Sequence, residues 1–143
     1  MTNITAFFAS YYFIAPIVAW LIACIVKAIV RSAKSGKFSL KLGFENGGMP
    51  STHSTIVSAI TVAVLLKTGL SELFFVALMF SLIIISDAFG VRQYIGKQGE
   101  ALNEVLKKSG KKPLKIVYGH TFLQVIVGIL WGAAVSIIFY FIL

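Results

Sequence analysis

The sequence IVYGHTFLQVIVGILWGAAVSIIFYFIL, residues 116–143, decides the fold because it contains no Asp, Glu, Lys or Arg. A hydrocarbon core about 30 Å thick requires a helix of about 20 apolar residues. Three more stretches lack the same four residue types, namely residues 1–26, 46–66 and 73–86. None of them alternates apolar and polar residues as the strands of a membrane β-barrel do. Together they predict an all-α, polytopic membrane helical bundle with about four transmembrane helices.

The composition excludes a soluble protein. The chain has 143 residues, of which 58% are hydrophobic, and a mean hydropathy of +0.91. A soluble domain of this length could not bury that much apolar surface. The net charge of +8 would favour nucleic acid as the partner of a soluble chain. In a membrane chain it reports topology and attraction to anionic lipid head groups, so we expect the lipid bilayer as partner and no nucleic acid.

Charges and turn-forming residues set the predicted spans within a single transmembrane domain, residues 1–143. The predicted spans are 7–29, 51–67, 72–89 and 120–143. The polar stretch before the last span contains a predicted cytoplasmic loop helix over 100–108, which Gly110 ends. Lys27, near the end of the first span, is expected to reach the membrane interface with its long side chain.

The basic residues predict the orientation. With four spans, twelve of the thirteen Lys and Arg residues lie on one side of the membrane, and only Lys67 lies on the other. Cytoplasmic loops carry the excess of Lys and Arg. We therefore expect a multi-pass protein of the cell (inner) membrane with both termini outside and the basic loops in the cytoplasm.

A set of polar side chains shares one position, the predicted cytoplasmic ends of spans two, three and four. Its members are Ser51, Thr52, His53, Asp87, Arg92 and His120. Ionisable groups at membrane depth are costly and usually functional. Because the three helix ends lie at the same face, we expect these residues to converge there.

This set predicts a phosphate site. The glycines before Ser51, including Gly48, let the backbone approach an anion, and a helix N-terminus attracts negative charge. The hydroxyls of Ser51 and Thr52 can donate hydrogen bonds, Arg92 can bind two phosphate oxygens, and Lys97 adds charge. With two histidines, one can attack phosphorus while the other protonates the leaving oxygen. This chemistry needs no metal and no cofactor.

Three segments carry a resemblance to a known family. They are GGMPSTHS at 47–54, DAFGVRQYIGKQGEALN at 87–103 and GHTFLQVIVG at 119–128. In order and spacing they resemble the divergent membrane branch of the type-2 phosphatidic acid phosphatase and vanadium haloperoxidase superfamily. The resemblance implies that Ser51 binds phosphate, that His53 protonates the leaving group and that His120 is the nucleophile. It implies a membrane phosphatase acting on a lipid or isoprenoid phosphate monoester.

The sequence departs from the superfamily's K-x6-R-P and P-S-G-H elements. Lys34 and Lys41 have the spacing of the first element, but Lys41 stands where an arginine is expected and Leu42 where a proline is expected. Thr52 replaces the glycine of the second element. Lys34 and Lys41 are therefore weaker candidates for substrate binding.

The third element, S-R-x5-H-x3-D, also differs. Leu114 stands in place of its arginine, and Arg92 is expected to substitute from the end of the third span. Gln124 replaces the acid that lies one helical turn after the nucleophile. Such an acid orients the imidazole and stabilises its positive charge. Gln124 can orient the ring without supplying charge, and Asp87 could supply that charge or pair with Arg92.

The sequence leaves several alternatives open. For substrates on the cytoplasmic leaflet, phosphatidylglycerophosphate and phosphatidate fit the predicted orientation. A non-catalytic protein that binds lipid phosphate, or a small transporter, is the alternative to an enzyme. A metal site built from Asp87, Glu100 and Glu104 is a weaker option. Gly128 and Gly132 form a G-x-x-x-G pattern that serves either close packing or a homodimer.

Overall fold

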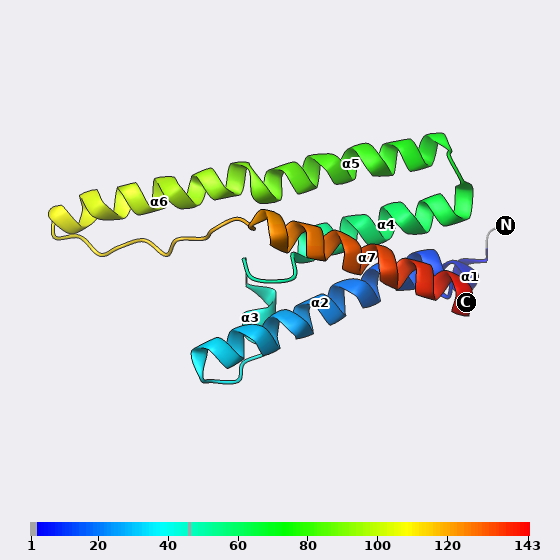
Figure 1. Cartoon of the computed structure of the whole chain (residues 1–143), viewed down its shortest axis with the longest axis horizontal. Helices are drawn as coiled ribbons and strands as arrows, with labels where there is room; N and C mark the ends of the chain where they lie inside the picture. Colours follow the sequence, from blue (N-terminus) through cyan, green and yellow to red (C-terminus); the bar gives the residue numbers. More distant parts are fainter. Residues whose placement is uncertain (1–2, 46) are drawn as a thin grey trace.

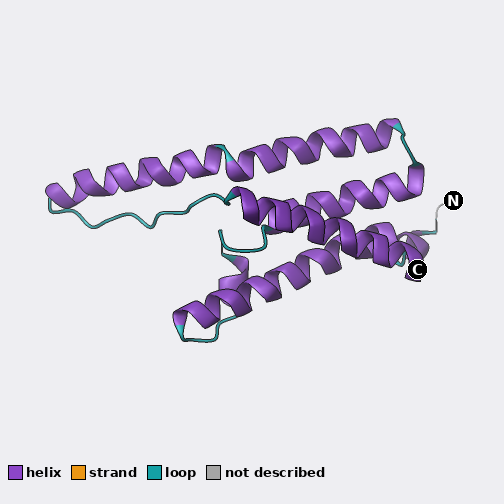
Figure 2. Cartoon of the chain, viewed as in Figure 1, coloured by secondary structure: helices purple, strands orange, loops and turns teal. Residues whose placement is uncertain are grey.

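The computed structural model describes residues 3–45 and 47–143, and over these residues the regular structure is entirely helical (Figure 2). This confirms the prediction of an all-α membrane bundle. The helices are α1 (Ile4–Phe8), α2 (Tyr11–Ser35), α3 (Lys41–Phe44), α4 (Thr52–Thr68), α5 (Glu72–Phe89), α6 (Val91–Lys108) and α7 (Phe122–Ile142).

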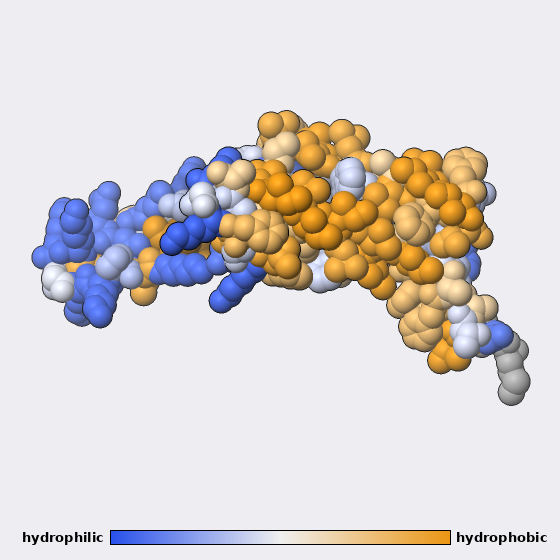
Figure 3. All heavy atoms as spheres, turned by 90° about the horizontal axis from the view of Figure 1, so that it is seen from below, coloured by the Kyte–Doolittle hydropathy of each residue, from blue (hydrophilic) through white to orange (hydrophobic). Residues whose placement is uncertain are grey.

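Three helical segments are long and apolar enough to cross a membrane, and α4 is a shorter apolar helix. The three segments are Ile4–Ser35, Glu72–Lys108 and Phe122–Ile142. Apolar side chains cover the bundle, whereas hydrophilic side chains gather at the end where α6 projects (Figure 3). Helix α1 and the C-terminal end of α7 lie together at the opposite end (Figure 1). Lys67 is at that end too, 3.3 Å from the centre of the Tyr12 ring.

The shorter helix α4 is the centre of the bundle and contacts α2, α5 and α7. Its 17 residues span only about 26 Å at 1.5 Å per residue, but its neighbours surround it with protein. Hydroxyl groups join α4 to the helices beside it. Ser58 donates to the carbonyl of Ile129 at 2.8 Å, and Ser136 donates to the carbonyl of Ala59 at 2.7 Å. These bonds hold the N-terminal half of α4 against α7.

The predicted G-x-x-x-G face of α7 is a close-packing face within the chain. Gly128 and Gly132 are both buried. A Cβ atom on Gly128 would lie 2.6 Å from the carbonyl oxygen of Ser51, and one on Gly132 would collide with the carbonyl oxygen of Thr55. Because α4 occupies this face, it is not available to a second chain. A homodimer stays a prediction and would need another surface.

We expect Gly132→Leu to destabilise the bundle, because the new side chain must separate α7 from the backbone of α4. Overpacking of a tight interface costs about 1–3 kcal/mol or more. Thermal unfolding in detergent should therefore shift to a clearly lower temperature. Ala134→Leu adds a similar side chain to an exposed position of the same helix and is the matched control. Equal unfolding temperatures for Gly132→Leu and Ala134→Leu would contradict the close packing of α7 on α4.

The structure corrects two boundaries. The first span was expected to end at 29, but α2 continues to Ser35. The loop helix was expected over 100–108, but α6 begins at Val91, directly after the break at Gly90. Residues 111–121, called the return segment below, run back along α6 to the start of α7 (Figure 1). The predicted cytoplasmic loop is therefore a helix with an extended segment packed on it.

Candidate active site

The backbone of His120 is fixed by two neighbouring helices. Its N–H donates to the carbonyl of Ala88 in α5 at 2.9 Å, and its carbonyl accepts from the side chain of Gln93 in α6 at 3.2 Å. Gly119 makes this approach possible, since a Cβ there would lie 2.8 Å from the same Ala88 oxygen. As a result His120 is only 2% exposed.

Gln124 orients the ring of His120. Its Oε1 lies 3.2 Å from Nδ1 of His120 and also accepts from the backbone N–H of Thr121 at 3.1 Å. The second bond belongs to a capping box at the start of α7. Because a backbone N–H can only donate, the shared atom is the amide oxygen, and Nδ1 of His120 must carry a hydrogen. Nε2 of the neutral ring is then unprotonated and has a lone pair.

The surroundings of His120 favour its neutral form. Burial lowers the pKa of His120, and the positive charge of Lys27 acts in the same direction. The hydrogen bond to Gln124 acts in the opposite direction, but the pKa stays below its ordinary value. At neutral pH the ring is therefore mainly the unprotonated base that a nucleophile requires.

His53, the second residue of α4, faces this ring. The two ring centroids are 6.0 Å apart. Nε2 of His53 lies 3.5 Å from Nη1 of Arg92, and Nε of Arg92 donates to Oδ2 of Asp87 at 2.7 Å. Of the two roles left open for Asp87, the structure shows pairing with Arg92. These four residues of the predicted set, His53, Asp87, Arg92 and His120, lie close together, as their places at the helix ends indicated.

Ser51 and Thr52 form the start of α4. Ser51 is fully buried, and its Oγ accepts from both the N–H and the hydroxyl of Ser54, at 3.3 and 3.0 Å. This hydroxyl therefore caps the helix. The backbone N–H of Ser51 donates to the carbonyl of Gln124 at 3.1 Å, which ties the starts of α4 and α7 together. The role of Ser51 in phosphate binding stays a prediction.

Lys27 belongs to the site, and the sequence analysis missed it. Its side chain is 1% exposed, and Nζ donates to Oγ1 of Thr52 at 3.4 Å and to the carbonyl of Glu45 at 3.3 Å. The expectation that Lys27 reaches the membrane interface is therefore wrong. Gly48, with φ of +89°, packs so closely that a Cβ would lie 3.3 Å from Cγ of Lys27. The sequence does not show where the Lys27 side chain points, because this depends on how the turn at Gly48 packs against α2.

Comparison with known proteins places the chain in a family. Residues 8–135 match the family described as the Divergent PAP2 family. The chain belongs to this family. It is also similar to a Bacillus subtilis (strain 168) protein described as "Uncharacterized membrane protein YuiD". The two are 31% identical over 138 residues, which cover 84% of this chain and 87% of that protein. No solved structure matches the chain.

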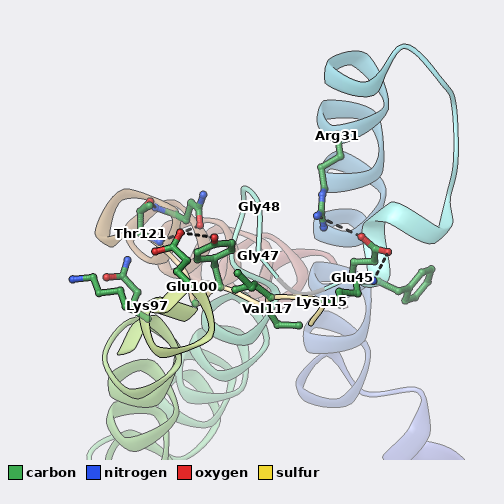
Figure 4. A pocket seen from close by; sticks show the side chains of 15 residues that line it. Arg31, Glu45, Gly47, Gly48, Lys97, Glu100, Lys115, Val117 and Thr121 are labelled. Carbon is green, nitrogen blue, oxygen red and sulfur yellow. Dashed lines mark hydrogen bonds and ion pairs between the residues drawn. The ribbon is translucent and has the colours of Figure 1, made fainter. Parts of the chain in front are cut away.

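This member of the Divergent PAP2 family has a cavity of about 710 Å³, whose lining residues are drawn in Figure 4. Gly48 and Gln124 belong to its wall, whereas neither histidine does. Gly119 and Thr121, the chain neighbours of His120, also line the cavity, so His120 lies directly behind its wall. The basic residues of the lining are Arg31, Lys97 and Lys115, and its acids are Glu45 and Glu100. Glu45 pairs with Arg31 at 3.5 Å and with Lys115 at 3.6 Å.

The remaining candidates lie away from the histidines. Lys34 and Lys41 are exposed and are not in the cavity wall, whereas Arg31, on the same helix as Lys34, is. Across residues 3–45 and 47–143, no group of three His, Cys, Asp or Glu side chains could hold a metal ion. Of the carboxylates considered for such a site, Asp87 bonds to Arg92 and Glu100 accepts from the hydroxyl of Tyr118 at 2.6 Å.

Proposed function

We propose that this protein is a membrane phosphatase that hydrolyses a lipid or isoprenoid phosphate monoester through a phosphohistidine intermediate. The observation that carries the proposal is the state of His120. Gln124 accepts from its Nδ1, which leaves Nε2 of the neutral ring with a lone pair, and the ring centroid of a second histidine lies 6.0 Å from its own. His53 would then lie beside a phosphoryl group carried by His120.

The proposed reaction has two steps. First, Nε2 of His120 bonds to phosphorus while the bond between phosphorus and the lipid alcohol oxygen breaks, and the alcohol leaves with a proton. Water then attacks the phosphohistidine and releases phosphate. Lys27 and Arg92 supply positive charge beside the histidines, which stabilises the charge that builds up on the phosphoryl oxygens. Both cations are fixed, by Thr52 and Asp87 respectively.

The cavity indicates what lies next to the phosphate. Its volume of about 710 Å³ exceeds what a lone phosphate group needs, and its lining combines three basic residues and two acids with apolar side chains such as Phe44 and Val117. A phosphate attached to a polar head group, as in phosphatidylglycerophosphate, or to a glycerol backbone, as in phosphatidate, fits this space. Phosphatidylglycerophosphate and phosphatidate are the substrates we propose first.

Phosphate release from purified protein tests the proposal. We expect release from at least one of phosphatidylglycerophosphate, phosphatidate and an isoprenoid phosphate in mixed micelles. Because Lys27 and Arg92 supply the charge, a chelator should leave the rate unchanged. Vanadate should inhibit, since it resembles the transition state of phosphoryl transfer. Binding of these lipids without any release would identify the alternative, a non-catalytic lipid-phosphate-binding protein.

The location of the site on the cytoplasmic side is a separate prediction. Ser51 and His120 are too buried to label, so cysteines are better placed at Ser109, beyond α6, and at Leu70, which is 89% exposed at the opposite end. In a Cys24→Ser background, a membrane-impermeant maleimide should label Leu70→Cys in intact cells and Ser109→Cys only after lysis. The reverse pattern would place the site outside.

A further inference from the structure

The two ring nitrogens of His53 have different surroundings. Nε2 lies 3.5 Å from Nη1 of Arg92. Among the residues that the structure describes, Nδ1 is the one buried side-chain nitrogen or oxygen without a hydrogen-bond partner. An unpaired buried polar atom is costly, so its presence in a fold calls for an explanation. A ligand that supplies the missing partner is such an explanation.

The contact with Arg92 decides which nitrogen of His53 carries hydrogen. A guanidinium group is always charged and can only donate. Nε2 must therefore accept, and the neutral ring has its hydrogen on Nδ1. A protonated ring would point an N–H group at Arg92 and add a positive charge between Arg92 and Lys27. Asp87, the acid nearby, bonds to Arg92, so it fixes the guanidinium against His53.

We propose that Asp87 and Arg92 are positioning residues that keep His53 neutral, with Nδ1–H as a hydrogen-bond donor for an oxygen of the substrate phosphate. This inference rests on the proposed function and changes the role that the resemblance implies for His53. A neutral imidazole that lost its only N–H proton would become an imidazolate, an unstable anion. His53 in this state stabilises negative charge by hydrogen bonding and gives up no proton.

The leaving oxygen then needs another proton source, and the substrate contains one. A phosphate monoester has a second pKa of about 6, so part of it is a monoanion with one P–O–H group near neutral pH. As Nε2 of His120 bonds to phosphorus and the ester bond breaks, that proton moves to the alcohol oxygen. The products are the neutral alcohol and a phosphohistidine, and His53 is unchanged.

The state of His53 can be measured without any activity. The chain has two histidines, so a sample with ¹⁵N-labelled histidine contains only two rings, which His120→Ala assigns. At pH 7 in detergent we expect protonated Nδ1 and bare Nε2 for His53. Arg92→Met should remove this preference, and vanadate should shift the Nδ1–H signal of the native protein. A doubly protonated ring, an Nε2–H form, or no response to vanadate would overturn the proposal.

Kinetics of His53 variants separate hydrogen-bond donation from proton donation. The amide of His53→Gln can donate a hydrogen bond but cannot transfer a proton as an acid does. We expect His53→Gln to retain phosphate release within about tenfold of the native rate and His53→Ala to lose far more. Equal losses of phosphate release in both variants would overturn the role of His53 as a hydrogen-bond donor. If no form of the protein releases phosphate, the proposed function fails, and the labelled-histidine experiment still decides the state of His53.

Discussion

Replacing His120 by alanine should reduce phosphate release at least a thousandfold. Loss of a covalent nucleophile leaves only the catalysis that comes from binding and from charge stabilisation. In this site Lys27 and Arg92 would still attract the substrate, so its binding should change far less than its turnover. The measurement is single-turnover phosphate release from phosphatidate, together with alkaline detergent quenching of reactions with ³²P-labelled substrate. The native protein should give an acid-labile phosphohistidine, and His120→Ala should give none.

His53→Ala is the matched control, because it removes the facing imidazole and leaves the nucleophile in place. This variant should still form the labelled intermediate, though slowly. Since His120 is only 2% exposed, thermal unfolding must show that His120→Ala keeps the fold. A labelled intermediate in folded His120→Ala would mean that the nucleophile is another residue.

The fold was predictable from the long stretches of sequence that contain no charged residue. Four stretches without charge indicated the helices of the bundle, and the basic residues indicated that both termini share one end. The start of α6 was not predictable, since Gly96 and Gly99 are poor helix formers. The reason for these two glycines appears only in the tertiary structure. Tyr118 and Ile116 of the return segment pack against the two glycines, where a larger residue would keep them away.

The site was predictable for those of its residues that lie at the ends of predicted helices. His53, Arg92 and His120 each lie at a helix end, and the ends meet. Lys27 could not be found in this way, because it lies inside α2, eight residues before the end of the helix at Ser35. Its place depends on where the glycine turn packs. The partner of Asp87 depended on side-chain geometry in the same way, and only the structure distinguishes a bond to Arg92 from one to His120.

Gln124→Glu should increase the rate of phosphate release by about 10- to 100-fold. Loss of the carboxylate beside a catalytic histidine costs a serine protease about 10⁴-fold, so restoring one here should recover part of such an effect. The change suits the structure because a single oxygen of Gln124 accepts from both His120 and Thr121. A glutamate can accept both bonds, keeps the capping box and places negative charge at a helix N-terminus.

The same substitution should raise the pKa of His120, since a carboxylate would adjoin Nδ1. The native pKa lies below the ordinary value, and the reaction needs the neutral ring. Activity is therefore lost as the pH falls through this pKa, and in Gln124→Glu the loss should begin at a higher pH. The rates are best compared at pH 8, where both forms of the protein have a neutral His120. Gln98→Glu adds the same charge at an exposed position of α6 and should change neither quantity. If Gln124→Glu raises the pKa without increasing the rate at pH 8, the charge of an orienting acid is not what limits this enzyme.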